Sequence, residues 1–255
     1  MRVVRLHAEG LRLEEGERPV PGDGEVVVAV HAAAITRGEL EWPADRLPAV
    51  PSHELSGVVV ETGEQVFALT PFDRDGVAAD YAVVPAAILA PKPRNLTHVE
   101  AAALPMGGLS AWQALFVHGR LQPGERVIVT GPSGGVGQLA VQLARHAGAT
   151  VVEDPPAELV FDTVGGELPA GARTVTIAAE APGATYFIVE PDRSQLVELA
   201  RLAETGEVTA AIDSTFALER AQDAFDRVAA HGKRGKVVLD VAGQPSATAG
   251  DSHAP

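Results

Sequence analysis

The chain has 255 residues with a formal net charge of −14, 46% hydrophobic residues and no cysteine. This length accommodates one large or two modest domains, and the acidic balance argues against nucleic acid or an anionic membrane as a partner. The absence of cysteine excludes disulfides, thiolate nucleophiles and cysteine-ligated zinc. The sequence contains no apolar run of membrane-spanning length and no secretory core at its N-terminus, so a cytoplasmic protein is expected.

The first third of the chain alternates short β-branched runs with turns that are rich in glycine and proline. Such runs lie at residues 3–6, 11–13, 25–30, 65–69 and 80–84. This pattern is typical of the strands of an antiparallel β-domain. Residues 31–40 are expected to leave the third strand, and another strand is expected to follow His53 and Glu54.

The pattern becomes helical from Thr97 onward. Glu100 follows Thr97 at the spacing of a capping box, which predicts a helix start. Pro105 and the pair Gly107-Gly108 are expected to interrupt this helix before a second one that carries Trp112. The helical segment would join the β-domain to the rest of the chain.

The chain is organised around residues 126–148, with the sequence RVIVTGPSGGVGQLAVQLARHAG. A β-rich run passes through a glycine turn into an amphipathic helix. Glycine allows the backbone to approach a bound group, and the N–H groups at the helix start suit a pyrophosphate. The spacing G-x-x-G-x-x-G departs from G-x-G-x-x-G, so a turn that only packs a helix on a sheet remains an alternative. The cofactor-binding candidates here are Gly131, Ser133, Gly134, Gly135, Val136 and Gly137.

Acidic residues follow the next predicted strand, at residues 149–152. Glu153 and Asp154 lie close to the spacing, about 20 residues after the first glycine, at which a carboxylate meets the adenosine ribose in dinucleotide-binding units. A carboxylate in that role would favour NADH, because it would repel the 2′-phosphate of NADPH. The alternative is that both are solvated turn residues before Pro155-Pro156.

The remaining pattern predicts a second alternation of strands and helices. Strands are expected at 158–162, 173–177, 185–189 and 235–240, and helices from Asp192 and at 218–230. Residues 243–255 are small and polar, and a disordered tail is expected there.

Six segments stand in a distinctive order along the chain. They are PSHELSGVV (51–59), EAAALP (100–105), SAWQAL (110–115), the glycine turn, FDTVGG (161–166) and GKVVL (235–239). Together they resemble the medium-chain dehydrogenase/reductase superfamily, and more narrowly its zinc-independent quinone oxidoreductase and enoyl reductase branch.

The resemblance implies an α/β plus β fold. A GroES-like β-barrel catalytic domain would comprise residues 1–118 and 213–242, and a truncated Rossmann domain with a doubly wound parallel sheet would comprise residues 119–212. It also implies a homodimer, with NADP or NAD in the cleft between the two domains. The reaction would be hydride transfer to a small-molecule enone, quinone or polyketide-like substrate.

The resemblance also implies the residues of the site. Nicotinamide and substrate would be lined by Thr36, Glu39, Ser110, Gly165, Gly166 and Phe187. Thr36 and Glu39 stand where the family often has Asn and Asp. The candidate proton donors are Tyr81, Tyr186 and His53, or water. A single imidazole is not a zinc site, so His53 is expected to be a hydrogen-bonded barrel residue and the enzyme to be zinc-independent.

The predicted nucleotide domain is shortened. Between Gly137 and Leu159 there is room for one helix and one strand only, because a βαβ unit needs about 30 residues. In the order 3-2-1-4-5-6 the lost strand is the edge strand, so the remaining sheet could survive. The adenosine half of the cofactor lies over the removed elements. Two functions therefore stay open: a compact reductase, and a non-redox cyclase or isomerase that keeps the fold without productive dinucleotide binding.

Overall fold

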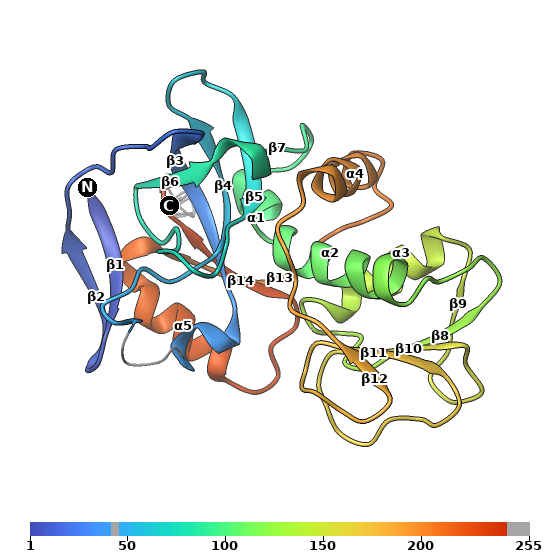
Figure 1. Cartoon of the computed structure of the whole chain (residues 1–255). Coiled ribbons are helices and arrows are strands. Elements are labelled where there is room, and N and C mark those ends of the chain that lie inside the picture. The colour runs from blue at the N-terminus through green and yellow to red at the C-terminus, as the bar shows by residue number, and fades with distance from the viewer. Residues whose placement is uncertain (42–45, 244–255) are drawn as a thin grey trace, which may run out of the picture.

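The computed structural model describes residues 1–41 and 46–243. A barrel-like β part and a parallel-sheet part lie side by side, and helices fill the space between them (Figure 1). Almost all of the predicted disordered tail lies outside the described residues.

The β part is organised around the long strand β3 (Glu25–Ile35). Strand β4 (Glu54–Val59) pairs along one edge of β3, while β6 (Tyr81–Pro85) and β14 (Lys236–Asp240) share its other edge. The sheet continues through β5 (Gln65–Leu69), β7 (Ala90–Pro91) and β13 (Ile212–Ala217), and β1 (Arg2–His7) and β2 (Gly10–Glu15) form a separate antiparallel pair. The C-terminal segment thus completes the sheet that the N-terminal segment begins.

Strand β3 is longer than the sequence predicted. The chain was expected to leave this strand at His31, but pairing continues to Ile35 after a register shift between Val30 and Ala32. The run of alanines there has little β-propensity of its own. It is held in the sheet by β14, which comes from the far end of the chain, and this is tertiary context overriding local preference.

The second sheet has five parallel strands in the order β12-β11-β10-β8-β9. They are β8 (Arg126–Val129), β9 (Thr150–Val151), β10 (Leu159–Asp162), β11 (Arg173–Thr176) and β12 (Ala184–Tyr186). This is the doubly wound order without its outermost strand, so β9 becomes the edge strand. The predicted fold class, a GroES-like barrel with a truncated Rossmann domain, is confirmed.

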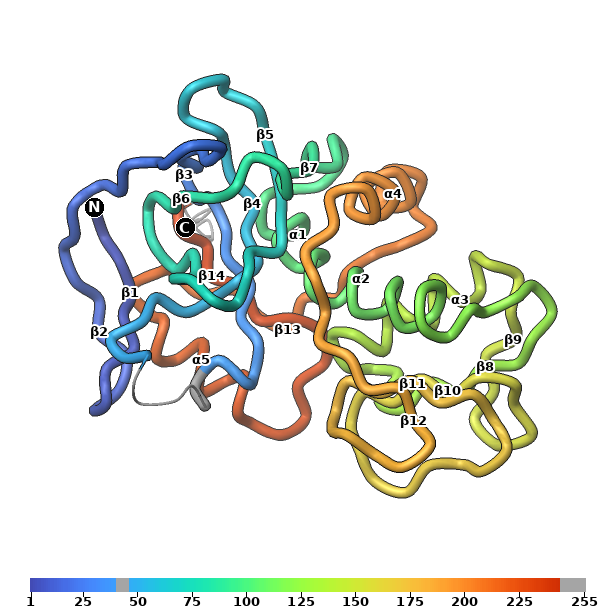
Figure 2. The backbone as a smooth tube through the Cα atoms, viewed as in Figure 1, coloured from blue at the N-terminus to red at the C-terminus, as the bar shows by residue number. Residues whose placement is uncertain are grey.

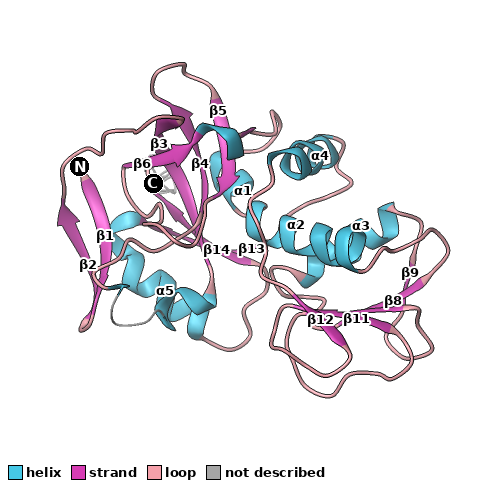
Figure 3. Ribbon diagram, in the orientation of Figure 1, coloured by secondary structure: helices cyan, strands magenta, loops and turns pink. Residues whose placement is uncertain are grey.

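Helices cover one face of this parallel sheet. They include α2 (Pro105–Trp112), its π-helical continuation η4 (Gln113–His118) and α3 (Gly137–His146), with α4 (Arg193–Glu204) beside α2. The strands β9 to β12 are joined by loops without helices. Figures 2 and 3 show these loops running along the face opposite to α2 and α3. The shortening therefore removes helices from one face as well as a strand from one edge.

The helix ends follow the predicted capping. Thr97 and Glu100 form the expected capping box at the start of α1 (His98–Ala102), and Asp192 caps α4. The predicted interruption is present before Pro105, which begins α2, but Gly107 and Gly108 are not part of it, because both lie inside α2. A Cβ on Gly107 would stand 2.7 Å from the carbonyl oxygen of Gly135. Glycine is kept there to let α2 approach the glycine turn.

The helical segment at the C-terminal end of the barrel begins as predicted. A 3-10 turn, η5 (Leu218–Arg220), leads into α5 (Ala221–Ala229). Phe225 and Val228 of α5 are buried in the barrel core together with β3 and β14 residues. The barrel is therefore closed by residues from both ends of the chain, which fixes β14 beside β3.

Candidate active site

Two adjoining cavities lie between the barrel and the parallel sheet. The first, of about 310 Å³, has mostly apolar walls that include Phe72, Ile177 and Phe187. The second, of about 400 Å³, lies over the glycine turn. Thr36 and Val136 line both cavities. One cleft therefore joins an apolar chamber to a glycine-lined chamber, with the Thr36 hydroxyl at their junction.

The glycine turn forms the floor of the second cavity. It follows β8, and Gly131 adopts a left-handed φ of +60° that favours glycine. A Cβ on Gly137 would stand 2.1 Å from the carbonyl oxygen of Gly131, so the start of α3 requires glycine. Gly134 forms a parallel bridge with Gly235. This bridge holds the turn against the beginning of β14.

Three cationic side chains line the same cavity. They are Arg37, Lys233 and Lys236, and among the described residues no aspartate or glutamate lines it. Burial lowers the pKa of Lys233, and the neighbouring Lys236 lowers it further. Because Lys236 is paired with the buried Glu54, Arg37 and Lys233 supply the net positive charge beside the first turn of the helix, in a chain with a net charge of −14. The cavity is suited to an anion.

A buried ion pair connects the two parts of the cleft. The Lys236 ammonium donates hydrogen bonds to a Glu54 carboxylate oxygen and, at 3.1 Å, to Thr36 Oγ1. The side chains of Lys236 and Glu54 are 7% and 0% exposed. The backbone N–H of Met106, in α2, donates to the other Glu54 oxygen at 2.9 Å. Sequence reasoning missed this pair, although Glu54 is the lone charge of β4 and Lys236 precedes the apolar run of β14.

Glu39 is a second buried carboxyl group at the cleft. Its oxygens accept hydrogen bonds from the backbone N–H groups of Thr36 at 3.0 Å and of Ser52 at 2.7 Å. Burial raises the pKa of Glu39 to about 8, and the nearby Glu54 contributes in the same direction. Glu39 therefore carries a proton at neutral pH. Its two hydrogen bonds hold the backbone at Thr36 and at Ser52 in place.

This pKa predicts a pH-dependent stability. Between about pH 4.5 and pH 8 the folded protein holds a proton on Glu39 that the unfolded chain has lost, so stability should fall as pH rises through that window. The slope is at most about 1.4 kcal/mol per pH unit. His53 and His98, whose pKa values burial lowers to about 4, act in the opposite direction, but only below about pH 6.5. Urea titrations between pH 6.5 and 8 should therefore show the slope in the wild type and not in Glu39→Gln. Equal slopes would contradict the assignment.

The structure brings most of the predicted site residues together. Around the apolar cavity lie Thr36, Glu39, Ser110, Val136, Tyr186 and Phe187, and around the glycine-lined cavity lie Gly131, Ser133, Gly134 and Gly135. Gly137 is buried behind the turn. Gly165 and Gly166 follow Val164, which lines the second cavity, and the Gly165 N–H donates to Asp162 at 2.9 Å. Neither glycine lines either cavity, so their predicted contact with the nicotinamide stays a prediction.

Two predicted site residues lie elsewhere. Tyr81 is in β6, paired with β3, and the Arg18 guanidinium lies 4.4 Å from its ring centroid. It lines a different cavity with N-terminal residues, so its prediction as a proton donor is wrong. Its β-strand places it on the barrel rather than at the cleft. Glu153 is exposed after β9 and lines neither cleft cavity.

Comparisons with known proteins agree with this architecture. Two family models match: "Zinc-binding dehydrogenase" over residues 140–239 and "Alcohol dehydrogenase GroES-like domain" over residues 22–74. The chain is 30% identical to the "Probable zinc-binding oxidoreductase, mitochondrial" of Arthroderma benhamiae, and the match covers 92% of this chain and 94% of that protein. The chain belongs to the medium-chain dehydrogenase/reductase superfamily. It is an oxidoreductase of that superfamily.

Other members of the superfamily are also similar. The chain is 29% identical to the 2-methylene-furan-3-one reductase of Solanum lycopersicum, over 85% of this chain and 72% of that protein. Among solved structures, the quinone oxidoreductase of Thermus thermophilus, also solved in complex with NADPH, matches with a TM-score of 0.80 and 27% identity, covering 94% of this chain and all of that chain. The Arthroderma alignment extends over 316 positions, more than the 255 residues of this chain. This superfamily member therefore lacks internal segments that the relative has.

The surroundings of His53 bear on metal binding at the cleft. His53 is buried, its Nδ1 lies 3.1 Å from Thr70 Oγ1, and its ring packs edge-on against Phe72. Among the described residues, no group of three or more His, Cys, Asp or Glu side chains is arranged to hold a metal ion. One imidazole cannot supply a tetrahedral zinc site. His53 is hydrogen-bonded within the barrel, as the sequence predicted, and it also lines the apolar cavity, where its role as a proton donor stays a prediction.

None of the helices within the described residues combines the length and hydropathy that a membrane span requires.

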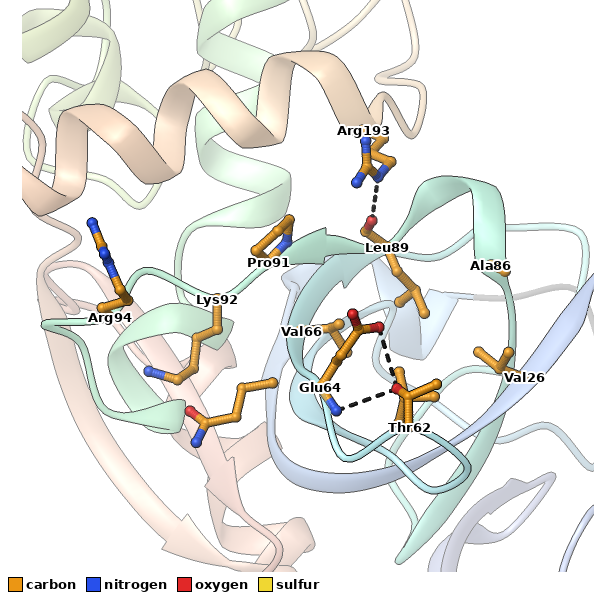
Figure 4. A pocket seen from close by; sticks show the side chains of 12 residues that line it. Val26, Thr62, Glu64, Val66, Ala86, Leu89, Pro91, Lys92, Arg94 and Arg193 are labelled. Carbon is orange, nitrogen blue, oxygen red and sulfur yellow. Dashed lines mark hydrogen bonds between the residues drawn. The ribbon is translucent and has the colours of Figure 1, made fainter.

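A cavity of about 600 Å³ lies apart from the cleft, where the β4–β5 turn and β7 face α4 (Figure 4). There Arg193 donates to the carbonyl oxygen of Leu89 at 2.7 Å and Lys92 to that of Pro93 at 2.9 Å. No residue of the glycine turn lines this cavity, so the cleft remains the candidate active site.

Proposed function

We propose that this protein is a zinc-independent, NAD(P)H-dependent reductase of a small enone or quinone. The observation that carries the proposal is that the glycine turn, three cations and the Thr36 hydroxyl open on one continuous cleft. Similar proteins support the substrate class, because they include the furanone reductase above and an NADPH-dependent alkenal/one oxidoreductase of Arabidopsis thaliana. The dimer and the cytoplasmic location implied by the sequence stay predictions.

The residues fit the reactive half of such a cofactor. The glycine turn presents backbone without side chains, and the start of α3 together with Lys233 would hold the phosphate nearest to the nicotinamide. The nicotinamide would then enter the apolar cavity beside Ser110 and Phe187. The reduced nicotinamide supplies a hydride when it is bound. The protein contributes alignment, exclusion of water and a proton.

Thr36 is placed to deliver that proton. Its hydroxyl oxygen accepts a hydrogen bond from the Lys236 ammonium at 3.1 Å, and its proton is directed to Glu54 Oε1 at 3.4 Å and the Met106 sulfur at 3.3 Å, long contacts that it would exchange for a substrate oxygen. Reduction of an enone or quinone places negative charge on the substrate oxygen. Thr36 would transfer its proton to that oxygen and recover one from Lys236, which would regain its own from water entering the cleft after the product leaves. Tyr186, which is 39% exposed on the opposite wall, is the second candidate donor.

The apolar cavity constrains the substrate. Phe72, Ile177 and Val189 form its walls, and Glu39 is protonated there at neutral pH, so the pocket suits a flat, uncharged molecule. A cavity of about 310 Å³ has room for a small ring system beside the nicotinamide. A non-redox cyclase or isomerase would use the same cavity without the cation-lined one.

Ser133 provides a direct test. Its side chain is exposed on the turn, so Ser133→Asp should leave folding within about 0.5 kcal/mol of the wild type. The new carboxylate would repel the bound phosphate, so the affinity for NADPH should fall by about tenfold or more. Titrations followed by nicotinamide fluorescence and calorimetry would measure this, with the near-isosteric Ser133→Asn as the neutral control. Absence of NADPH and NADH binding by the wild type at millimolar concentration would favour the non-redox alternative.

A further inference from the structure

The two ends of the nucleotide site are built very differently. At the nicotinamide end, the glycine turn, Arg37, Lys233 and Lys236 enclose a cavity of about 400 Å³. At the other end, β9 has two residues and is the edge strand of the sheet. The chain then runs through the exposed residues 153–156 into β10 without forming a helix.

An adenosine moiety needs walls that this end lacks. In doubly wound sheets, ligands bind in the crevice beyond the carboxyl ends of the strands. On this side of β8 the sheet stops at β9, so no neighbouring strand and following helix stand beyond it in the described chain. Neither cleft cavity includes a residue between Gly137 and Asp162. Adenosine bound there would keep most of its surface in water and gain little from burial.

Resting on the proposed function, we infer that this protein binds its cofactor through the nicotinamide, ribose and adjacent phosphate alone. The ligand that the site recognises is a nicotinamide mononucleotide unit. Reduced nicotinamide mononucleotide should therefore serve nearly as well as a dinucleotide. The 2′-phosphate that separates NADPH from NADH would lie outside the built site, so the two should bind with similar affinity. Glu153 would then be a solvated turn residue and would not select NADH.

Calorimetric titration of the full-length protein with reduced nicotinamide mononucleotide, NADH and NADPH tests this inference. The three dissociation constants should agree within about tenfold, and 2′,5′-ADP, which carries only the adenosine half of NADPH, should not displace the mononucleotide at millimolar concentration. Ser133→Asp should weaken the mononucleotide and NADH by the same factor, because both would place their shared phosphate on the turn.

The possible outcomes separate the two proposals. If NADH or NADPH binds a hundredfold more tightly than the mononucleotide, or if 2′,5′-ADP competes, the adenosine half has its own site. That result would overturn this inference and leave the reductase function standing. If none of the three nucleotides binds, both the reductase function and this inference are wrong.

Discussion

Replacement of Lys236 by methionine should lower the free energy of unfolding by about 3–5 kcal/mol. The change leaves the Glu54 carboxylate, which is fully buried between β4 and α2, without its cation. Burial of an ion away from water has a large desolvation free energy. Removal of one partner of a buried ion pair leaves the other charge with that free energy uncompensated. Urea denaturation at neutral pH would measure the difference, with the m-value as a check that the unfolding transition keeps its character.

The matched control is the double variant Lys236→Met with Glu54→Gln. Glutamine keeps the shape of Glu54 and its bond to the Met106 N–H without the charge, so the double variant should be more stable than Lys236→Met alone. The double-mutant cycle isolates the coupling between the two side chains. A Lys236→Met protein as stable as the wild type would show that the ion pair, which links β14 and β4 across β3, does not stabilise the fold.

Replacement of Thr36 by valine should lower kcat by about a hundredfold, the lower end of the range for a positioned acid or base. Valine keeps the branched shape of threonine and removes only the hydroxyl that joins Lys236 to the substrate cavity. The KM for NADPH should change little, because the phosphate is held by the turn and not by Thr36. Steady-state oxidation of NADPH with a small quinone or enone, over a range of pH, would separate the two parameters.

Two further variants distinguish a catalytic role of Thr36 from a purely structural one. Thr36→Ser keeps the hydroxyl and should retain most of the activity. Tyr186→Phe removes the other candidate donor on the opposite wall and should affect kcat less than Thr36→Val. The assignment of Thr36 fails if Thr36→Val keeps the wild-type kcat, or if only Tyr186→Phe loses it.

Much of the fold was readable from local pattern. The glycine turn, the capping box at Thr97 and the cap at Asp192 each depend on residues a few positions apart, and all are present. The extension of β3 to Ile35 was not predicted, because it depends on pairing with β14, about 200 residues later in the chain. Local β-propensity does not indicate a strand partner that lies so far away in the sequence.

The candidate site also contains residues that could be predicted and residues that could not. The family resemblance predicted that Thr36, Ser110, Phe187 and the glycine turn lie together, and the structure places them around one cleft. The Lys236–Glu54 pair was missed, since a charge in an apolar strand indicates a buried partner without saying which one. Tyr81 was wrongly chosen as a donor because a tyrosine in a strand gives no indication of which side of the barrel it faces.

Transfer of deuterium tests the reductase account most directly. The wild-type protein would be incubated with a small enone and NADPH or NADH carrying deuterium at C4, on each face of the ring in turn. Mass spectrometry would then follow the label into the product. The account predicts one deuterium on the β-carbon of the reduced product from one of the two faces only, because the cleft fixes the orientation of the nicotinamide. Unlabelled product from both faces, or no reduction while the nucleotide stays bound, would contradict it.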